Sequence, residues 1–297
     1  MHLPRLAPAA LVITLTTGCG AQSAPAALTP AEAVARQVEN SAGVKVTKIV
    51  RLDYGEAMPT SPADGDTIVP VDIGEYSESR TTGVLRLGTA ASDLTTTYSR
   101  TNIPEDLKSV IPDDLSYMTT RAISIGGSGT YEQRADRRDV PAGKTWLHHG
   151  DAGCGTAARL AGNLDARTVL SPQVLRRLAA PAPSSGEVID GVATVVHAGS
   201  AAQTEFVVPA PGDDPVMAAQ LRERVRQTEV SWRLWVGQDG LPRRVRLVTT
   251  DPEAVEGVPR TTVTEIDFTG WGSAVSVEPP PEDQVHETGS CLAPEPG

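Results

Sequence analysis

The sequence VSWRLWVGQDGLPRRVRLV, Val230–Val248, predicts two antiparallel strands joined by a tight turn. In its first half Trp232 and Leu234 alternate with polar residues, and in its second half Val245 and Leu247 alternate with arginines. A period of two places one face of a strand against a core and the other toward solvent. The Gln-Asp-Gly turn between the halves is typical of a β-hairpin. This stretch therefore predicts an antiparallel sheet.

Similar alternation, often rich in Thr, recurs along most of the chain. Thr and other β-branched residues fit antiparallel pairing in which one face of the sheet is solvated. The pair Asp190-Gly191 marks a second hairpin. Further strands are expected at residues 44–52, 76–87, 92–100, 115–125, 129–133, 145–148, 186–189, 192–198 and 262–269.

Three capped helices are expected beside these strands. Thr29–Glu32 is a capping box with Pro at the first helical position, and it opens a weakly apolar helix that runs to about Ser41. Ser171–Leu178 and Asp214–Gln227 begin with a capping residue followed by Pro and carry apolar stripes. Consecutive hairpins with few helices predict an α+β fold whose antiparallel sheet is covered on one face.

The N-terminus has the parts of a secretory signal peptide. A basic start at Met1–Arg5 precedes an apolar run, Leu11–Leu15, and a small residue before Cys19. The run is far shorter than the ~20 residues that span a bilayer. A cysteine at the cut resembles the lipobox of bacterial lipoproteins, whose thiol takes a diacylglyceryl group. The usual box has Leu at the position of Thr16.

We expect residues 1–18 to be a lipoprotein signal peptide, Cys19 to carry acyl chains such as palmitate, and residues 19–28 to be a flexible tether. Two or more acyl chains hold a protein stably on a membrane, so the expected location is the outer face of the cell membrane. In the alternative, cleavage at Ala24-Pro25-Ala26 discards Cys19 and secretes the protein.

The chain is acidic, with a formal net charge of −11 at pH 7. Removal of residues 1–18 takes away Arg5 and no acidic residue, so the mature chain is more acidic still. This charge argues against nucleic-acid binding and against electrostatic attachment to anionic lipid heads. Membrane attachment therefore depends on acyl chains. Aromatic residues make up only 4%, so any pocket must be built mainly from aliphatic side chains.

Cys154 and Cys291 remain after the lipobox, and an even remainder in an oxidising compartment most simply forms a disulfide. The alternative is a metal site that combines Cys154 with His148, His149 and Asp151. Adjacent histidines on a strand point to opposite faces, and an exported thiol is more readily oxidised than metallated. We therefore predict the disulfide and no metal.

No arrangement of residues predicts catalysis. Gly126–Gly129 falls short of a nucleophile elbow, because Thr130 stands where the second glycine is needed. No phosphate loop, dinucleotide fingerprint or zinc-protease helix occurs in the sequence. A Cys154 nucleophile would lack the rest of a thiol-hydrolase site. We expect no enzymatic activity and no cofactor.

Residues Trp235–Val245 resemble a segment of the mycobacterial LppX/LprAFG lipoprotein family, which has a similar tryptophan strand, Gly-Leu-Pro turn and arginine strand. The run Gly143–Leu147, the hairpin Gly186–Val192 and the closing Trp271-Gly272 agree with it in order, as does the lipobox at Cys19. The resemblance, which extends to LolA-like lipoprotein carriers, implies a strongly curved antiparallel sheet. This sheet would form a half-barrel with a few helices packed on its concave face.

The expected organisation is a single domain. No internal repeat or break in composition divides the chain, so one domain is expected at residues 29–278, followed by a Pro-rich tail at 279–297. We expect a monomer.

The resemblance also implies a function, because members of this superfamily hold acyl chains between sheet and helices. We expect a carrier or binding protein for a hydrophobic ligand in the cell envelope. Burial alone would hold such a ligand, at roughly 0.8 kcal/mol per methylene. The alternative is an envelope sensor or protein-interaction module without a transported ligand. The candidate pocket residues are Val174, Leu175, Leu178, Met217, Leu221, Val225 and Trp232.

Overall fold

The described part of the protein is built mainly from one large sheet. The computed structural model describes residues 28–53, 77–89, 91–100, 117–126, 128–135, 140–150, 165–206, 223, 225–226, 228–255 and 258–288. These residues form one open, mixed sheet of twelve strands with few helices. The predicted α+β class, built mainly from a large sheet, is confirmed.

The elements follow in this order along the chain. The helices are α1 (Pro30–Glu39), α4 (Ala166–Val169) and α5 (Pro172–Leu178), with short 3-10 helices η2 (Gln203–Phe206) and η3 (Glu282–Gln284). The strands are β1 (Gly43–Asp53), β2 (Ser77–Arg86), β3 (Ala91–Arg100), β4 (Tyr117–Ile125), β5 (Gly129–Arg134), β6 (Trp146–His149), β7 (Ser184–Ile189), β8 (Val192–Ala202), β9 (Glu229–Gly237), β10 (Pro242–Val255), β11 (Val258–Ser273) and β12 (Val285–Thr288).

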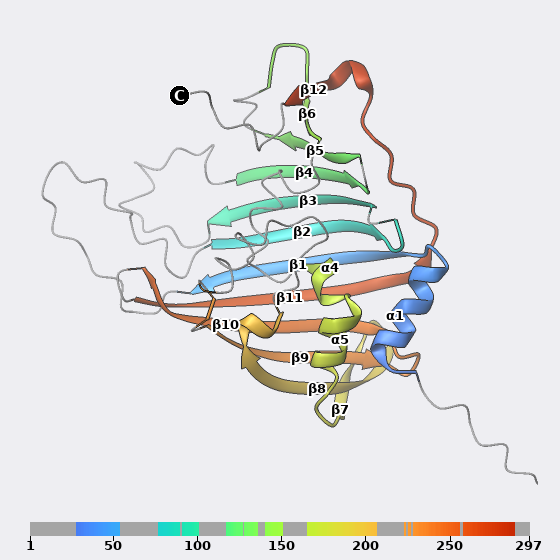
Figure 1. The fold of residues 1–297 in the computed structure, drawn as a ribbon, viewed down its shortest axis with the longest axis vertical. Helices are drawn as coiled ribbons and strands as arrows, with labels where there is room; N and C mark the ends of the chain where they lie inside the picture. Colours follow the sequence, from blue (N-terminus) through green and yellow to red (C-terminus); the bar gives the residue numbers. More distant parts are fainter. Residues whose placement is uncertain are drawn as a thin grey trace, which may run out of the picture.

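Pairing between β1 and β11 joins two antiparallel halves of the sheet (Figure 1). Strands β1 to β6 lie side by side in chain order, and β7 to β11 do the same. The two halves meet along β1 and β11, from Asp53 opposite Thr261 to Gly43 opposite Ser273. The sheet ends at β7 on one side and at β12 on the other, so it is not closed.

Strand β12 makes the sheet mixed. It runs parallel to β6, with Val285 opposite Trp146 and Thr288 opposite His149. The other neighbouring strands are antiparallel. The sequence prediction assigned this segment to a Pro-rich tail. Four residues that follow a run of prolines are too few to show an alternating pattern, so no local signal revealed β12.

The β9–β10 hairpin forms as predicted. Leu234 pairs with Val245, and both side chains are fully buried. Gly240 in the turn has a φ of +78°, a conformation that strains residues with a side chain. A Cβ at this position would lie 2.9 Å from the backbone oxygen of Leu28. Glycine therefore allows the turn to lie directly against the chain that leads into α1.

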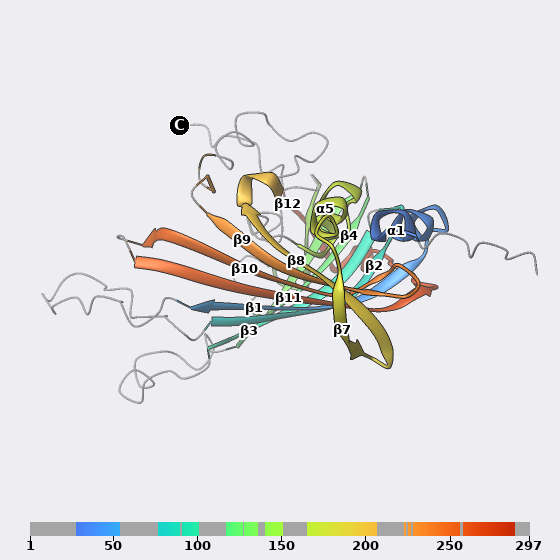
Figure 2. The ribbon, with the colours of Figure 1, turned by 90° about the horizontal axis from the view of Figure 1, so that it is seen from below.

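Helices α1 and α5 lie over the same face of the sheet (Figure 2). Both begin as predicted, α1 with the capping box at Thr29 and α5 with the Ser171 hydroxyl, which accepts a hydrogen bond from the Val174 N–H. Their apolar sides pack onto the centre of the sheet. The largest fully buried side chains are Phe206, Phe268, Leu85, Leu175, Leu178, Leu234, Leu247, Ile266, Val44, Val169, Val174 and Val230.

Several predictions fall outside the described residues. These are the signal peptide, Cys19 and the tether up to residue 27, both Cys154 and Cys291, and most of the helix expected at 214–227. Within the described ranges, no helix combines the length and apolar character needed to cross a bilayer.

Candidate functional site

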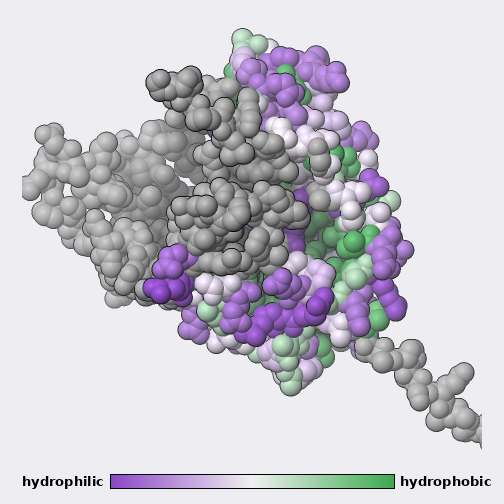
Figure 3. All heavy atoms as spheres, viewed as in Figure 1, coloured by the Kyte–Doolittle hydropathy of each residue, from purple (hydrophilic) through white to green (hydrophobic). Residues whose placement is uncertain are grey.

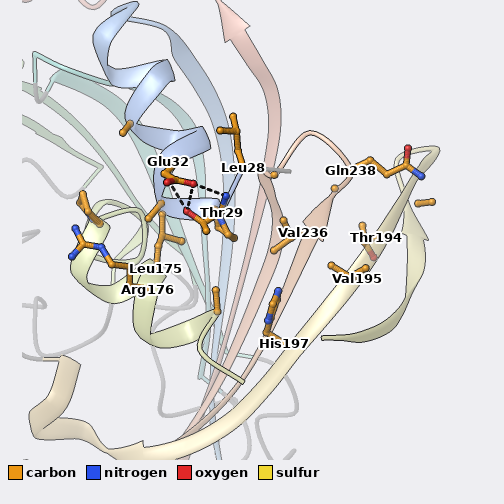
Figure 4. Close-up of a pocket in the computed structure, with 18 residues that line it drawn as sticks. Leu28, Thr29, Glu32, Leu175, Arg176, Thr194, Val195, His197, Val236 and Gln238 are labelled. Carbon is orange, nitrogen blue, oxygen red and sulfur yellow. Dashed lines mark hydrogen bonds between the residues drawn. The ribbon is translucent and has the colours of Figure 1, made fainter. Parts of the chain in front are cut away.

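A groove of about 1050 Å³ lies between the start of α1, helix α5, strand β8 and the β9–β10 turn (Figure 4). Most of its described lining is aliphatic. The apolar members are Leu28, Pro30, Ala31, Ala35, Pro172, Leu175, Ala179, Ala193, Val195 and Val236. The polar side chains in its lining are Thr29, Glu32, Arg176, Thr194, His197 and Gln238.

The capping box of α1 ties down the one carboxylate among the described lining residues. The backbone N–H and hydroxyl of Thr29 both donate to Glu32 Oε2, at 2.9 and 2.8 Å, and the Glu32 N–H donates to Thr29 Oγ1 at 3.3 Å. The hydrogen bond from the Thr29 backbone is the main reason why the pKa of Glu32 lies below its ordinary value. Glu32 therefore stabilises the start of the helix, and its exposed carboxylate is also accessible to water.

Strand β8 forms the floor of the groove. Val195 lies opposite Val236 of β9, and Ala193 lies opposite Val188 of β7, so these four side chains share one face of the sheet. Val195 is 41% exposed and Val188 is 67% exposed. Hydrophobic atoms reach the surface beside α1 and at the lower tip of the molecule, where β7 and β8 lie (Figure 3). The apolar floor, which includes Ala193 and Val195, thus continues beyond the groove to Val188 of β7.

His197 provides a polar group in this floor. It follows Val195 on the same face of β8, and its ring rises from the strand toward Val236 (Figure 4). The side chain is only 9% exposed, and its Nδ1 lies 2.7 Å from the backbone oxygen of Pro181. A carbonyl oxygen can only accept, so Nδ1 carries the hydrogen.

Among the pocket residues expected from the sequence, Leu175 lines the groove. Val174, Leu178 and Trp232 lie in the hydrophobic core below it. The indole Nε1–H of Trp232 donates to the Leu178 carbonyl at 3.0 Å, and the ring meets Phe206 edge-on with 5.6 Å between centroids. These three residues therefore hold α5, which forms a wall of the groove, against the sheet.

The remaining candidates are not among the described residues that line the groove. Val225 is buried, and it is not among the residues that line the groove. Met217 and Leu221 lie outside the described residues. The sequence candidates omitted α1 and β8, which supply a wall and the floor of the groove. The small residues Ala31 and Ala35, one helical turn apart on α1, were the available signal for a helix face that leaves room for a ligand.

The two histidines of β6 lie near the β12 edge of the sheet, where the Thr288 hydroxyl donates to the His148 carbonyl and also contacts the His149 ring. His148 stacks on Tyr131 and lies between the Glu287 carboxylate, 2.6 Å from Nδ1, and a backbone carbonyl, 2.7 Å from Nε2. His149 lies 3.4 Å from the Glu132 carboxylate and 2.9 Å from the Thr288 hydroxyl. Over the described part of the chain, no group of three or more His, Cys, Asp or Glu residues is arranged to hold a metal.

Two cations, Lys48 of β1 and Arg167 of α4, interact with the carboxylate of Asp165. Burial lowers the pKa of Lys48 on β1, and the nearby Asp165 carboxylate opposes this shift. Burial also lowers the pKa of Arg167, again opposed by Asp165. The Asp165 carboxylate is already the cap of α4, where it accepts from the Thr168 N–H at 2.6 Å. The two cations therefore share one carboxylate, which is a costly arrangement for charged groups removed from water.

No protein-family model matches the chain, and no curated protein matches its sequence. Function is therefore inferred from the sequence and from the geometry of the groove.

Proposed function

We propose that this protein is an extracytoplasmic lipoprotein, anchored to the outer face of the cell membrane through acylated Cys19, that binds a hydrophobic ligand in the groove. The groove carries this proposal, because its described lining is mainly aliphatic and lies between helices and sheet. The proposal includes the fold implied by the LppX/LprAFG resemblance, a strongly curved half-barrel with helices on its concave face. The protein acts as a monomer, without a cofactor or enzymatic activity.

The size and chemistry of the groove suit an acyl chain. Pockets for small ligands span roughly 300–1,000 Å³, so a groove of about 1050 Å³ is at the upper end of that range. Ten buried methylenes would contribute roughly 8 kcal/mol before the cost of ordering the ligand is subtracted. Alanines and valines in the lining contribute no polar group that would have to be desolvated.

The position of the groove also supports the proposal. Leu28 is the last residue of the expected tether and lines the groove. A tether over residues 19–28 reaches at most about 30 Å when fully extended. Acylation at Cys19 would therefore hold the groove near the membrane surface, from which a lipid ligand would come.

A disulfide between Cys154 and Cys291 belongs to the same proposal. His149 and Thr288 are opposite each other where the parallel strands β6 and β12 end. Cys154 follows His149 by five residues, and Cys291 follows Thr288 by three. Both cysteines thus follow, within a few residues in the sequence, strand ends that are neighbours in the sheet, which supports the proposed pairing. Peptide mapping without reductant tests it, and two free thiols in the exported protein would contradict it.

The second candidate function is protein interaction without a transported ligand. Val188 and Val195 are among the few large hydrophobic side chains that are exposed in the described residues, and Val188 lies on the edge strand β7. An edge strand with exposed apolar residues can pair with a strand of another protein. Loss of partner capture after Val188→Lys, with lipid binding absent from the unsubstituted protein, would favour this candidate.

Native mass spectrometry tests the main proposal, with the chain carrying Cys19→Ala so that covalent lipid is absent. Co-purified lipid mass is expected. Ala193→Trp should abolish it, because Ala193 is exposed in the groove floor and an indole there fills the space. The matched control is Ala198→Trp, on the opposite face of β8 and also exposed. An empty protein that also fails to take up added lipid would contradict the proposal.

A further inference from the structure

The His197 ring has one satisfied nitrogen and one that faces the groove. Nδ1–H donates to the Pro181 carbonyl. Nε2 has no hydrogen-bond partner within the described ranges, and it is not one of the atoms sealed from solvent. The side chain is more than nine-tenths buried, so this nitrogen is reached through the groove that it lines.

Most of the residues that line the groove together with His197 are apolar. Leu175 and Ala179 of α5 and Val195 and Val236 of the sheet line the same groove. A polar atom that enters an apolar site without a partner loses the free energy of its bonds to water. A purely hydrocarbon ligand would displace water from Nε2 of His197 and leave this nitrogen without a hydrogen bond. A ligand with one suitable polar group would form a hydrogen bond to it.

The charged residues that line the groove are Glu32 and Arg176, and neither needs a hydrogen bond from a ligand. His197 is therefore the residue that would bond to a polar group of the ligand. The Glu32 carboxylate accepts two hydrogen bonds from Thr29. Arg176 is exposed on the outer side of α5, where water solvates its guanidinium. In Figure 4 the Arg176 side chain points away from His197.

We propose that His197 is the polar anchor of the groove and that the ligand is a single-chain lipid whose head carries a hydroxyl group. This inference rests on the proposed function. A hydroxyl is both donor and acceptor, so it donates to the bare Nε2 of the neutral ring and accepts from Nε2–H of the charged ring. A carboxylate can only accept, and the net charge of −11 opposes its approach. The hydroxyl therefore fits Nε2 in both protonation states.

His197→Asn separates the two nitrogens. The Asn side-chain N–H₂ stands near the position of Nδ1 and can still donate to the Pro181 carbonyl, whereas nothing replaces Nε2. His197→Ala removes both functions and reports the structural contribution of the Pro181 bond. Thermal unfolding of the two variants checks that His197→Asn keeps the fold.

The test compares three ligands with the same eighteen-carbon chain, namely monooleoylglycerol, oleyl alcohol and methyl oleate. Displacement of a fluorescent acyl probe from the Cys19→Ala chain measures their affinities. We expect the two hydroxyl lipids to bind roughly 3- to 10-fold more tightly than methyl oleate, the range given by one net hydrogen bond. His197→Asn should bind all three with the affinity of methyl oleate.

The outcomes separate this inference from the proposed function. Equal binding of the three ligands by the unsubstituted chain, or a preference for hydroxyl lipids that survives His197→Asn, would overturn the role of His197 and leave the proposed function standing. Failure of all three ligands to bind would overturn both. A preference for monooleoylglycerol alone would also overturn the role of His197, because oleyl alcohol carries a hydroxyl on the same chain. If both hydroxyl lipids bind more tightly than methyl oleate, tighter binding of monooleoylglycerol would indicate an acylglycerol as the source of the hydroxyl, and equal binding would indicate a simple alcohol.

Discussion

Trp232 lies over the space that a side chain at Gly199 would occupy. The two residues are opposite each other on β9 and β8, and a Cβ at position 199 would lie 2.6 Å from Cζ2 of the indole. The ring cannot move freely, because its Nε1–H is bonded to the Leu178 carbonyl at the end of α5. The glycine therefore allows one indole to join strand β8, strand β9 and helix α5.

Gly199→Ala is expected to lower the free energy of unfolding by about 1–3 kcal/mol, the usual cost of overfilling a packed core. The added methyl must displace a ring that is held by a hydrogen bond. Chemical denaturation measures the change. Gly150→Ala is the control, since a Cβ there meets nothing within 4 Å. Equal stability of the two variants would mean that the indole is not fixed.

Trp232→Phe should cost more stability than Trp271→Phe. Each indole donates to a backbone carbonyl, Trp232 to Leu178 at 3.0 Å and Trp271 to Pro242 at 2.9 Å. Trp232 is buried, so the loss of its N–H leaves the Leu178 carbonyl without a hydrogen bond and lowers the free energy of unfolding by about 1–3 kcal/mol. Trp271 is partly exposed, and water can replace its hydrogen bond. Urea titration of both variants checks the order, and a reversed order would refute it.

Glu32→Gln is expected to change how stability depends on pH. The hydrogen bonds from Thr29 lower the pKa of Glu32 below its ordinary value of 4.5. The contribution of the carboxylate is therefore complete above about pH 4.5 and is lost as the pH falls through the lower pKa of the folded state. The difference in unfolding free energy between wild type and Glu32→Gln should be constant near neutrality and shrink in acid.

The Thr29→Ala background provides the control for the Glu32 prediction. Thr29→Ala alone should cost about 1 kcal/mol as the loss of an N-cap. Adding Glu32→Gln to it should produce a smaller acid dependence than in the wild type, because the Thr29 hydroxyl is gone whereas the backbone N–H at position 29, the larger cause of the lowered pKa, still donates to the carboxylate. An undiminished acid dependence in that background would show that the hydroxyl does not contribute to the effect of Glu32.

Lys48→Met is expected to stabilise the protein at neutral pH. Burial lowers the pKa of Lys48, so the unfolded chain holds this proton more tightly than the folded one. Stability therefore rises with pH between the folded pKa and the ordinary value of 10.5, and the gain from Lys48→Met should shrink over that window. Lys45→Met, exposed on the other face of β1, should change stability by less than about 0.5 kcal/mol. A destabilised Lys48→Met variant would contradict the expectation.

Removal of residues 285–297 should loosen β6 without unfolding the rest of the sheet. The truncation deletes β12, which pairs with β6 from Trp146 to His149. Hydrogen exchange of β6 amides should become faster, and that of β9 and β10 should stay the same. Glu287→Gln, which removes only an ion pair with a largely exposed carboxylate, should have little effect. Faster exchange throughout the sheet would show that β12 supports more than the edge.

The elements that the sequence predicted correctly have signals within a few consecutive residues. The capping box of α1 occupies four positions, and the hairpin at Asp190-Gly191 shows the positive φ values, +49° and +77°, that these residue types favour. The pairing of β1 with β11 has no such signal. Period-two alternation identifies a strand but does not identify its partner.

The sequence does not show which apolar residues line the groove and which lie in the core, because this too depends on contacts between distant segments. Leu175 and Leu178 lie one turn apart on the same side of α5 and both are fully buried, yet only Leu175 is among the residues that line the groove. Which of the two lies beside the groove depends on how the helix packs against the sheet, and that packing leaves no mark on the local sequence. His197 carried no local signal at all, since its role depends on Pro181, sixteen residues away.

The joining of the two halves of the sheet through β1 and β11 has a consequence for the order of folding. Val50 and Thr264, which are opposite each other there, are more than two hundred residues apart in the chain. Contacts of such long range form slowly, because the intervening chain loses much entropy before the contact gains any energy. The first strand to leave a ribosome or a translocon must therefore wait for one of the last before the centre of the sheet can close.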